Sequence, residues 1–288
     1  MKKHFTNTIF IAGFLFSVIM FLFFIYANCN CQFNLFNLDL VKSNELLITD
    51  FKHKKKTKYQ KIKKQVDNIV QAKVDTTHKR FLLVGDSQVG GLMYPFYNYC
   101  KYNGHDLALA LVCNSARDVT FANNDTLKLL IEKYKPDHIV LVVGLNQVFQ
   151  DRFSKSELAI EKILSTFNGI PYSWVGPASW IPDNGITECY RNNLDVGCFY
   201  ASDKLILDRG NDGRHPSPSA YYIWMDSIAQ WMQNESIYHI KMQKPLQFNA
   251  NYAFTHRSFN AGRVKKDPIT KIAIDTSSVK VIIDSLGN

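Results

Sequence analysis

Three short segments of the chain carry residue types that together could perform acyl transfer. Ser87 lies in the segment GDSQ (residues 85–88), directly after an apolar run, where the N-terminus of a following helix would favour negative charge. Asp212 and His215 are three residues apart, so the carboxylate can reach Nδ1 and leave Nε2 free to take a serine proton. Asn146 follows another apolar run and could donate its amide to an oxyanion. Each segment alone is weak evidence, because such residues often cap helices and loops.

The chain around these segments alternates between apolar runs and helical patterns. Helical spacing of apolar residues predicts one helix after each of the first three runs, and a last helix that begins at Ser217 and Pro218. Four fully apolar strands separated by helices predict a parallel sheet covered on both faces, which is an α/β fold. Functional groups in such sheets gather at the carboxyl ends of the strands. The four apolar runs are residues 80–85, 107–113, 138–144 and 171–176.

The order of these segments resembles the SGNH hydrolase superfamily, also called GDSL-type esterases and lipases. That family has its serine in a GDS block, an asparagine in a GxN block, and its aspartate and histidine in a DxxH block near the C-terminal end. Ser87, Asn146, Asp212 and His215 match these blocks residue by residue. The resemblance covers about residues 79–240 and implies a flavodoxin-like three-layer α/β/α fold. It also implies a serine nucleophile, an acyl-enzyme and no metal or organic cofactor.

One block of the family pattern is altered. The family usually has a glycine after the second strand, whose backbone N–H joins the oxyanion hole, whereas residues 113–118 read CNSARD. Ala116 stands about where that glycine is expected, and alanine keeps the N–H but adopts positive φ less readily. Gln147 also follows Asn146 where the family commonly has aspartate. The resemblance therefore implies an oxyanion hole made by the backbone N–H groups of Ser87 and Ala116 and the side chain of Asn146.

An apolar segment near the N-terminus predicts a membrane anchor. Residues 9–27 form nineteen residues with one clearly polar member, and as a helix they would span about 28 Å, close to a bilayer core. Lys2 and Lys3 before this span favour a cytoplasmic N-terminus and an external domain. A cleaved signal peptide is the alternative, but the run exceeds the usual length and no small-x-small cleavage site follows. We expect residues 1–28 to be an uncleaved signal anchor.

The positive charge of the chain is confined to one window. The net charge is +9, and residues 51–80 hold eleven basic residues and two acidic ones, which accounts for all of it. The rest of the chain is balanced, so the composition argues against a cationic domain that binds nucleic acid. Residues 29–78 are therefore predicted to be a basic linker, more plausibly a solvated spacer than a stalk that binds anionic lipid or polymer.

The stretch 177–214 is predicted to be irregular. Cys189 and Cys198 are separated by eight residues there, which predicts a disulfide in an oxidising compartment. Its aromatic residues either stack on sugar rings or pack against the core, and core packing is the favoured reading for each of them. These aromatic residues are Trp180, Tyr190, Phe199 and Tyr200. No CxxC or HxxxH spacing indicates a zinc site in the sequence.

The resemblance and the anchor together imply a membrane-anchored serine esterase, whose catalytic domain spans residues 79–247. We expect it to act outside the membrane on an ester, an O-acetyl group on a carbohydrate or envelope polymer. An O-acyltransferase with the same site and a non-catalytic envelope-binding module with the same fold remain alternatives. Residues 248–288 are predicted to be a C-terminal extension, with a β-hairpin pattern near residues 270–284.

Overall fold

The computed structural model describes residues 14–18, 20, 33–35, 38–40, 73–150, 152–249 and 251–261. The chain divides into two compact units, residues 1–63 and 64–288. In the first unit, residues 14–18 and 20 are helical, and β1 (Phe33–Leu35) pairs antiparallel with β2 (Leu38–Leu40). Among the residues described, none of the helices is both long and apolar enough to cross a membrane. Most of the expected anchor and of the basic linker lies outside the described residues.

The second unit contains a six-stranded sheet in which every pair of neighbouring strands is parallel. The strand order is β7-β6-β5-β3-β4-β8. Without β8, this order is the flavodoxin-like 2-1-3-4-5 arrangement, so the predicted parallel α/β sheet is confirmed. The strands are β3 (Arg80–Gly85), β4 (Asp106–Asn114), β5 (His138–Val142), β6 (Tyr172–Val175), β7 (Phe199–Tyr200) and β8 (His256–Asn260).

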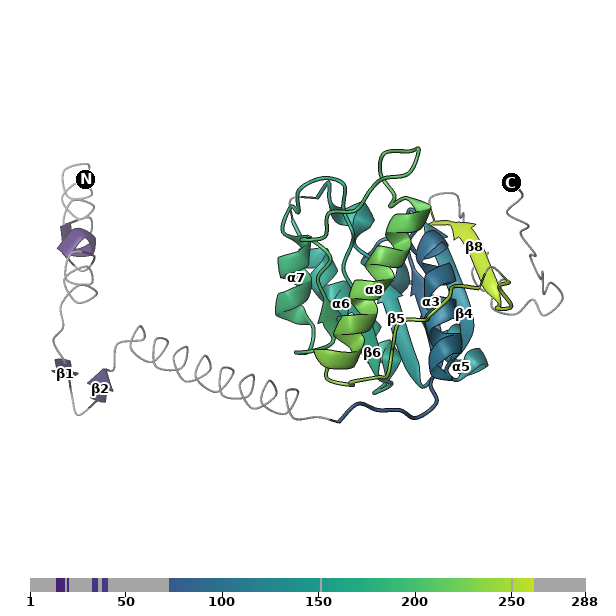
Figure 1. The fold of residues 1–288 in the computed structure, drawn as a ribbon. Helices are drawn as coiled ribbons and strands as arrows, with labels where there is room; N and C mark the ends of the chain where they lie inside the picture. The colour runs from purple at the N-terminus through teal and green to yellow at the C-terminus, as the bar shows by residue number, and fades with distance from the viewer. Residues whose placement is uncertain are drawn as a thin grey trace. The chain divides into compact units, whose positions relative to one another are not determined.

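Helices cover both faces of this sheet (Figure 1). Side chains alternate along each strand, so Phe81 and Leu83 of β3 enter one buried cluster with α3 and α8. Leu82 and Val84 enter the other cluster, which the remaining helices complete. The unit therefore has three layers. Its helices are α3 (Val89–Asn103), α4 (Asp118–Ala122), α5 (Thr126–Tyr134), η1 (Leu145–Gln147), α6 (Ser154–Phe167), α7 (Ile186–Asn193) and α8 (Pro218–Asn234).

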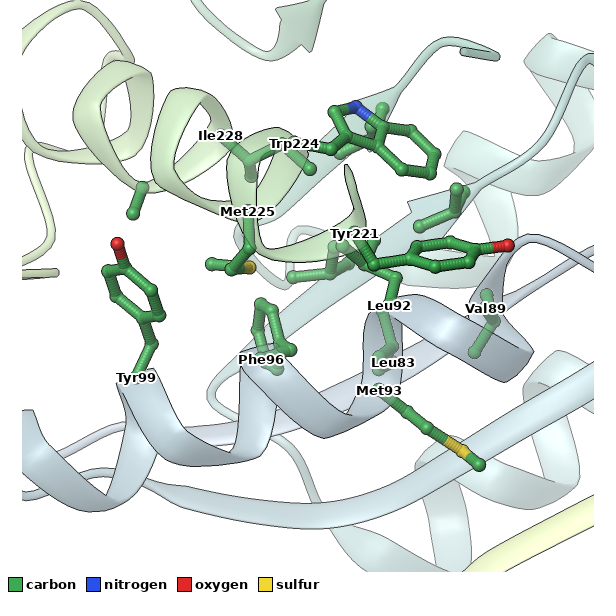
Figure 2. Close-up of a cluster of buried hydrophobic side chains, with 14 of the residues drawn as sticks. Leu83, Val89, Leu92, Met93, Phe96, Tyr99, Tyr221, Trp224, Met225 and Ile228 are labelled. Carbon is green, nitrogen blue, oxygen red and sulfur yellow. The ribbon is translucent and has the colours of Figure 1, made fainter. Parts of the chain in front are cut away.

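The packing of α8 on α3 fixes the two helices whose N-termini flank the predicted site. Figure 2 shows Met225 of α8 and Phe96 of α3 pointing toward one another, and both side chains are fully buried. Ser217 caps α8, because its hydroxyl accepts a hydrogen bond from Ala220 N at 3.2 Å, as predicted. This cap fixes where α8 begins, two residues after His215.

One local prediction needs correction. The stretch 177–214 is not wholly irregular, because it contains α7 and the two-residue strand β7. The short, mostly polar α7 and the brief β7 carry too little apolar periodicity to be recognised from the sequence.

The backbone contacts of the folded unit extend beyond the predicted domain boundaries of residues 79 and 247. At the N-terminal side, Asp75 N donates to His239 O at 2.7 Å, and Lys241 N donates to Asp75 O at 2.9 Å. At the C-terminal side, β8 pairs with β4 as an edge strand, within the segment predicted to be an extension (Figure 1). Both boundaries are therefore too narrow. The predicted hairpin near residues 270–284 lies outside the described residues.

The predicted disulfide between Cys189 and Cys198 is absent, and both residues are buried free thiols. Cys189 lies on α7 within reach of the Asn193 side chain, whereas the Cys198 thiol lies 3.7 Å from the Tyr238 hydroxyl. Burial raises the pKa of each thiol to about 11, so both stay protonated at neutral pH. The two side chains belong to the hydrophobic cluster, which explains why they are cysteines without being paired.

Candidate active site

The predicted site lies where the sheet order reverses, at the carboxyl ends of β3 and β5. The turn after β3 approaches β5 closely, because Asp86 N donates to Val142 O at 2.9 Å. Gly85 makes this approach possible: a Cβ at that position would lie 2.0 Å from the same Val142 oxygen. A residue with a side chain would push the turn away from β5. The glycine therefore positions Ser87 beside the loop that follows β5.

The structure brings Ser87, His215 and Asp212 together in one chain of hydrogen bonds. Ser87 Oγ lies 2.7 Å from His215 Nε2, across 128 residues of sequence. His215 Nδ1 lies 2.5 Å from Asp212 Oδ2. Ser87 is half-buried, and the side chains of His215 and Asp212 are 32% and 50% exposed. The serine hydroxyl, the imidazole and the carboxylate are thus aligned in the order that nucleophilic catalysis requires.

The turn that carries Asp212 fixes the tautomer of His215. Asp212 Oδ1 accepts hydrogen bonds from Arg214 N at 2.9 Å and His215 N at 3.0 Å. The His215 side-chain hydrogen bond and these two backbone donors hold the pKa of Asp212 below its usual range. The ionised carboxylate can only accept, so Nδ1 carries the proton and Nε2 presents a lone pair to Ser87. Gly213 has φ +66°, which glycine adopts without strain.

A half-buried arginine joins this turn to the loop after β6. The Arg209 guanidinium donates to Ala178 O at 3.0 Å, to Ser179 O at 2.5 Å and to Arg214 O at 3.2 Å. Burial lowers the pKa of Arg209, yet these three carbonyls compensate the charge. Gln88 holds the same loop from the other side, since its Nε2 donates to Ala178 O at 2.9 Å. Neither residue was singled out from the sequence.

Asp86 ties the nucleophile turn to the loop that carries Asn146. Its fully buried carboxylate accepts hydrogen bonds from Gln88 N at 3.0 Å and Leu145 N at 3.2 Å. Burial raises the pKa of Asp86 to about 6, against the lowering effect of these donors. The residues on either side of this bridge, Ser87 and Asn146, are thereby held close to one another. The only sequence signal was an acid placed directly after a fully apolar strand.

Asn146 lies in η1, half-buried, and its side chain faces the segment after β4. One N–H of its amide donates to Ala116 O at 2.8 Å, which leaves the second N–H for another acceptor. The predicted oxyanion role of Ala116 needs correction, because Ala116 N donates to Cys113 O at 3.0 Å within a tight turn. Its N–H is therefore already used, and its carbonyl positions Asn146 instead.

Ser115 has the geometry expected of the missing glycine. It is exposed and has φ +64°, the left-handed conformation that favours glycine. Ser115 directly follows β4, which is the neighbour of β3 in the sheet. Among the described residues, neither the Ser115 N–H nor the Ser87 N–H has a hydrogen-bond acceptor. Two unused backbone donors and one side-chain donor thus follow three adjacent strands.

The aromatic residues of the stretch 177–214 divide between core and surface. Tyr190 is fully buried, and Phe199 and Tyr200 pack against the hydrophobic clusters, as favoured from the sequence. Trp180 belongs to neither cluster and contacts Phe149 and Arg214. Within the part of the chain that the structure describes, no three His, Cys, Asp or Glu side chains form a metal-binding set.

Comparisons of the chain with models of protein families, with curated proteins and with solved structures found no match.

Proposed function

We propose that the protein is a serine esterase of the SGNH type that forms an acyl-enzyme on Ser87. The observation that carries this proposal is the aligned set Ser87–His215–Asp212, with 2.7 Å and 2.5 Å between successive polar atoms. A serine that only capped a helix would need no histidine at hydrogen-bond distance. A histidine that only capped one would need no carboxylate on its other nitrogen.

The geometry supports a specific course for the first half-reaction. Ser87 Oγ attacks the ester carbonyl carbon while its proton passes to His215 Nε2, and the carbonyl π electrons move onto oxygen. Asp212 accepts from Nδ1 and stabilises the imidazolium that forms. The tetrahedral intermediate then expels the alcohol, which takes the proton from Nε2. The acyl group remains on Ser87, and the electron pair of the broken C–O bond leaves with the alcohol oxygen.

We assign the oxyanion donors to the Ser87 N–H, the Ser115 N–H and the second N–H of the Asn146 amide. They follow β3, β4 and β5, which are neighbours in the sheet, with the Ser87 strand in the middle. Each such donor is typically worth about a hundred- to a thousand-fold in rate. This assignment replaces Ala116, whose N–H is used by Cys113, and it restores the three-donor pattern that the resemblance implies.

Hydrolysis is favoured over transfer by the openness of the site. The His215 side chain is 32% exposed, so water can reach the acyl-enzyme and pass its proton to Nε2. The attack of that water releases the carboxylic acid and returns the proton to Ser87 Oγ. An acyltransferase would need the acceptor alcohol to outcompete water at this exposed position.

Active-site labelling tests the proposal directly. A fluorescent alkyl phosphonate that carries a leaving group should form one stable bond to Ser87 in the wild-type chain. Ser87→Ala should abolish labelling, whereas Ser227→Ala should not, because the Ser227 hydroxyl is tied to the Ile223 carbonyl within α8. Absence of labelling in a folded wild-type protein would contradict the esterase assignment and favour a binding module.

We further propose that the domain works outside the membrane to which residues 9–27 anchor it, on O-acetyl groups of a carbohydrate polymer. This part rests on the apolar run, on Lys2 and Lys3 before it, and on the resemblance. Protease added to intact cells should remove the domain from the chain. Complete protection of the domain would contradict the outward orientation, and a mature N-terminus near residue 28 would contradict the uncleaved anchor.

A further inference from the structure

Three side chains at the rim of the candidate site form a surface that the catalytic proposal does not use. Phe149 and Trp180 have ring centroids 5.8 Å apart at an interplanar angle of 60°. The Arg214 guanidinium carbon lies 5.7 Å from the centre of the Trp180 ring. Phe149 is 73% exposed, so this surface is not part of the hydrophobic core. We call these three residues the rim cluster.

Each member of the rim cluster is fixed close to a catalytic group. Arg214 directly precedes His215, and its carbonyl is held by Arg209. Trp180 lies two residues after Ala178, whose carbonyl is bound by both Arg209 and Gln88, the residue after Ser87. Hydrogen bonds of Arg209 and Gln88 therefore connect the segments that carry Trp180 and Arg214 to the turn that carries Ser87.

The third member is held through the loop that carries Asn146. Phe149 lies three residues after Asn146 in this loop. The Asn184 side chain stabilises the loop, because its Nδ2 donates to Gln147 O at 2.9 Å. Aromatic rings that project beside a reactive serine suit the apolar face of a sugar ring. A sugar stacked on Trp180 would lie beside Arg214, which directly precedes His215 in the chain.

Among the described residues, the loops beside the rim cluster carry three arginines that form no salt bridge. Arg117 follows β4, whereas Arg209 and Arg214 both lie in the segment between β7 and α8. Asp212 is committed to His215, and Asp183 accepts from Gly185 N and from Thr187. The Arg209 guanidinium donates hydrogen bonds to backbone carbonyls. The Arg214 side chain is exposed to solvent.

We infer that the rim cluster binds an acylated sugar that carries an anionic group, with Trp180 and Phe149 under the ring and Arg214 on the anion. Guanidinium groups match carboxylate and phosphate oxygens in a bidentate manner. A stack alone would accept any sugar, so Arg214 is the group that would favour a charged sugar over a neutral one. This inference rests on the proposed esterase function, since it names the alcohol part of that ester.

Three matched substrates test the inference: a mono-O-acetylated methyl glucoside, the corresponding glucuronoside and the corresponding 6-phosphate. A charge-assisted hydrogen bond contributes about 1.5–3 kcal/mol, which predicts a kcat/KM at least about ten-fold higher for a charged substrate. The two charged substrates distinguish a carboxylate from a phosphate. Arg214→Gln should remove the preference mainly through KM, and Trp180→Ala should weaken all three substrates alike. Arg191→Gln is the control, because Arg191 is exposed but paired with Glu188.

Equal kcat/KM for neutral and charged substrates, or a preference that survives Arg214→Gln, would overturn the inference. Calorimetric binding of the same sugars to Ser87→Ala separates this failure from failure of the proposed function. If wild type is not labelled by phosphonate but Ser87→Ala binds the charged sugars selectively, the esterase assignment fails and the rim cluster stands. If wild type is labelled and binding shows no charge preference, the esterase stands and the rim cluster assignment fails.

Discussion

The buried carboxyl of Asp86 should make stability fall as pH rises through the weakly acidic range. The pKa of Asp86 is about 6 in the folded chain and about 3.8 in the unfolded chain. This difference is worth about 3 kcal/mol at 1.36 kcal/mol per pKa unit. Below about pH 3 the group is protonated in both states, so its contribution to stability is fully present. Between about pH 3 and pH 6 mainly the unfolded chain ionises, so unfolding becomes more favourable. Above pH 7 the loss is complete and constant.

Asp86→Asn removes the titrating carboxyl, so comparing the variant with wild type measures the contribution of this group to the pH dependence of stability. Denaturant unfolding of wild type and variant, from pH 4 to pH 8, should show the variant gaining about 2.5 kcal/mol relative to wild type, because a small part of the effect is already expressed at pH 4. The asparagine replaces an acceptor that faces Gln88 N and Leu145 N, which adds an offset that does not vary with pH. Glu161→Gln removes an exposed carboxyl and sets the baseline. A difference between wild type and Asp86→Asn that stays constant over this range would refute the reasoning.

Three further predictions follow from the backbone and the thiols. Gly85→Ala should lower the free energy of unfolding by about 3 kcal/mol, because its Cβ would lie 2.0 Å from a backbone oxygen. Gly90→Ala should not destabilise, because its Cβ would lie 3.8 Å from the Val112 side chain, an ordinary contact distance, within a helix. Ser115→Gly should raise the free energy of unfolding by about 1 kcal/mol and preserve kcat/KM, since only the N–H is needed; a ten-fold rate loss would argue for the hydroxyl. Mass mapping after denaturation in alkylating agent should find Cys189 and Cys198 both alkylated; a linked peptide pair would contradict the structure.

The central sheet was predictable because its strands are buried on both faces. β3, β4, β5 and β6 read as continuous apolar runs, and a parallel sheet covered by helices is the arrangement that suits such runs. The sequence HRSFN of β8 is polar and only partly buried, as expected of an edge strand, so its place beside β4 became visible only in three dimensions. β7 is two residues long and carries no periodicity at all.

The candidate site was predictable to the extent that its contacts are local or match the family blocks. Asp212 and His215 interact across one turn, so their spacing alone indicated the pair. The contact of Ser87 with His215 spans 128 residues, and only the order of the blocks pointed to it. The sequence could not predict that Ser115 would replace Ala116 as the proposed oxyanion donor. That assignment depends on the positive φ of Ser115 and on the hydrogen bond from the Ala116 N–H to Cys113 O.

The most direct test of the proposed mechanism is the rate of ester hydrolysis at neutral pH for four chains: wild type, Ser87→Ala, His215→Ala and the double variant. The 2.7 Å contact makes the two residues one unit, so each single change should remove nearly all activity and the double change should cost little more. Asp212→Asn should retain more activity than either, because it only orients and stabilises the imidazole. Hydrolysis that survives His215→Ala would contradict the account.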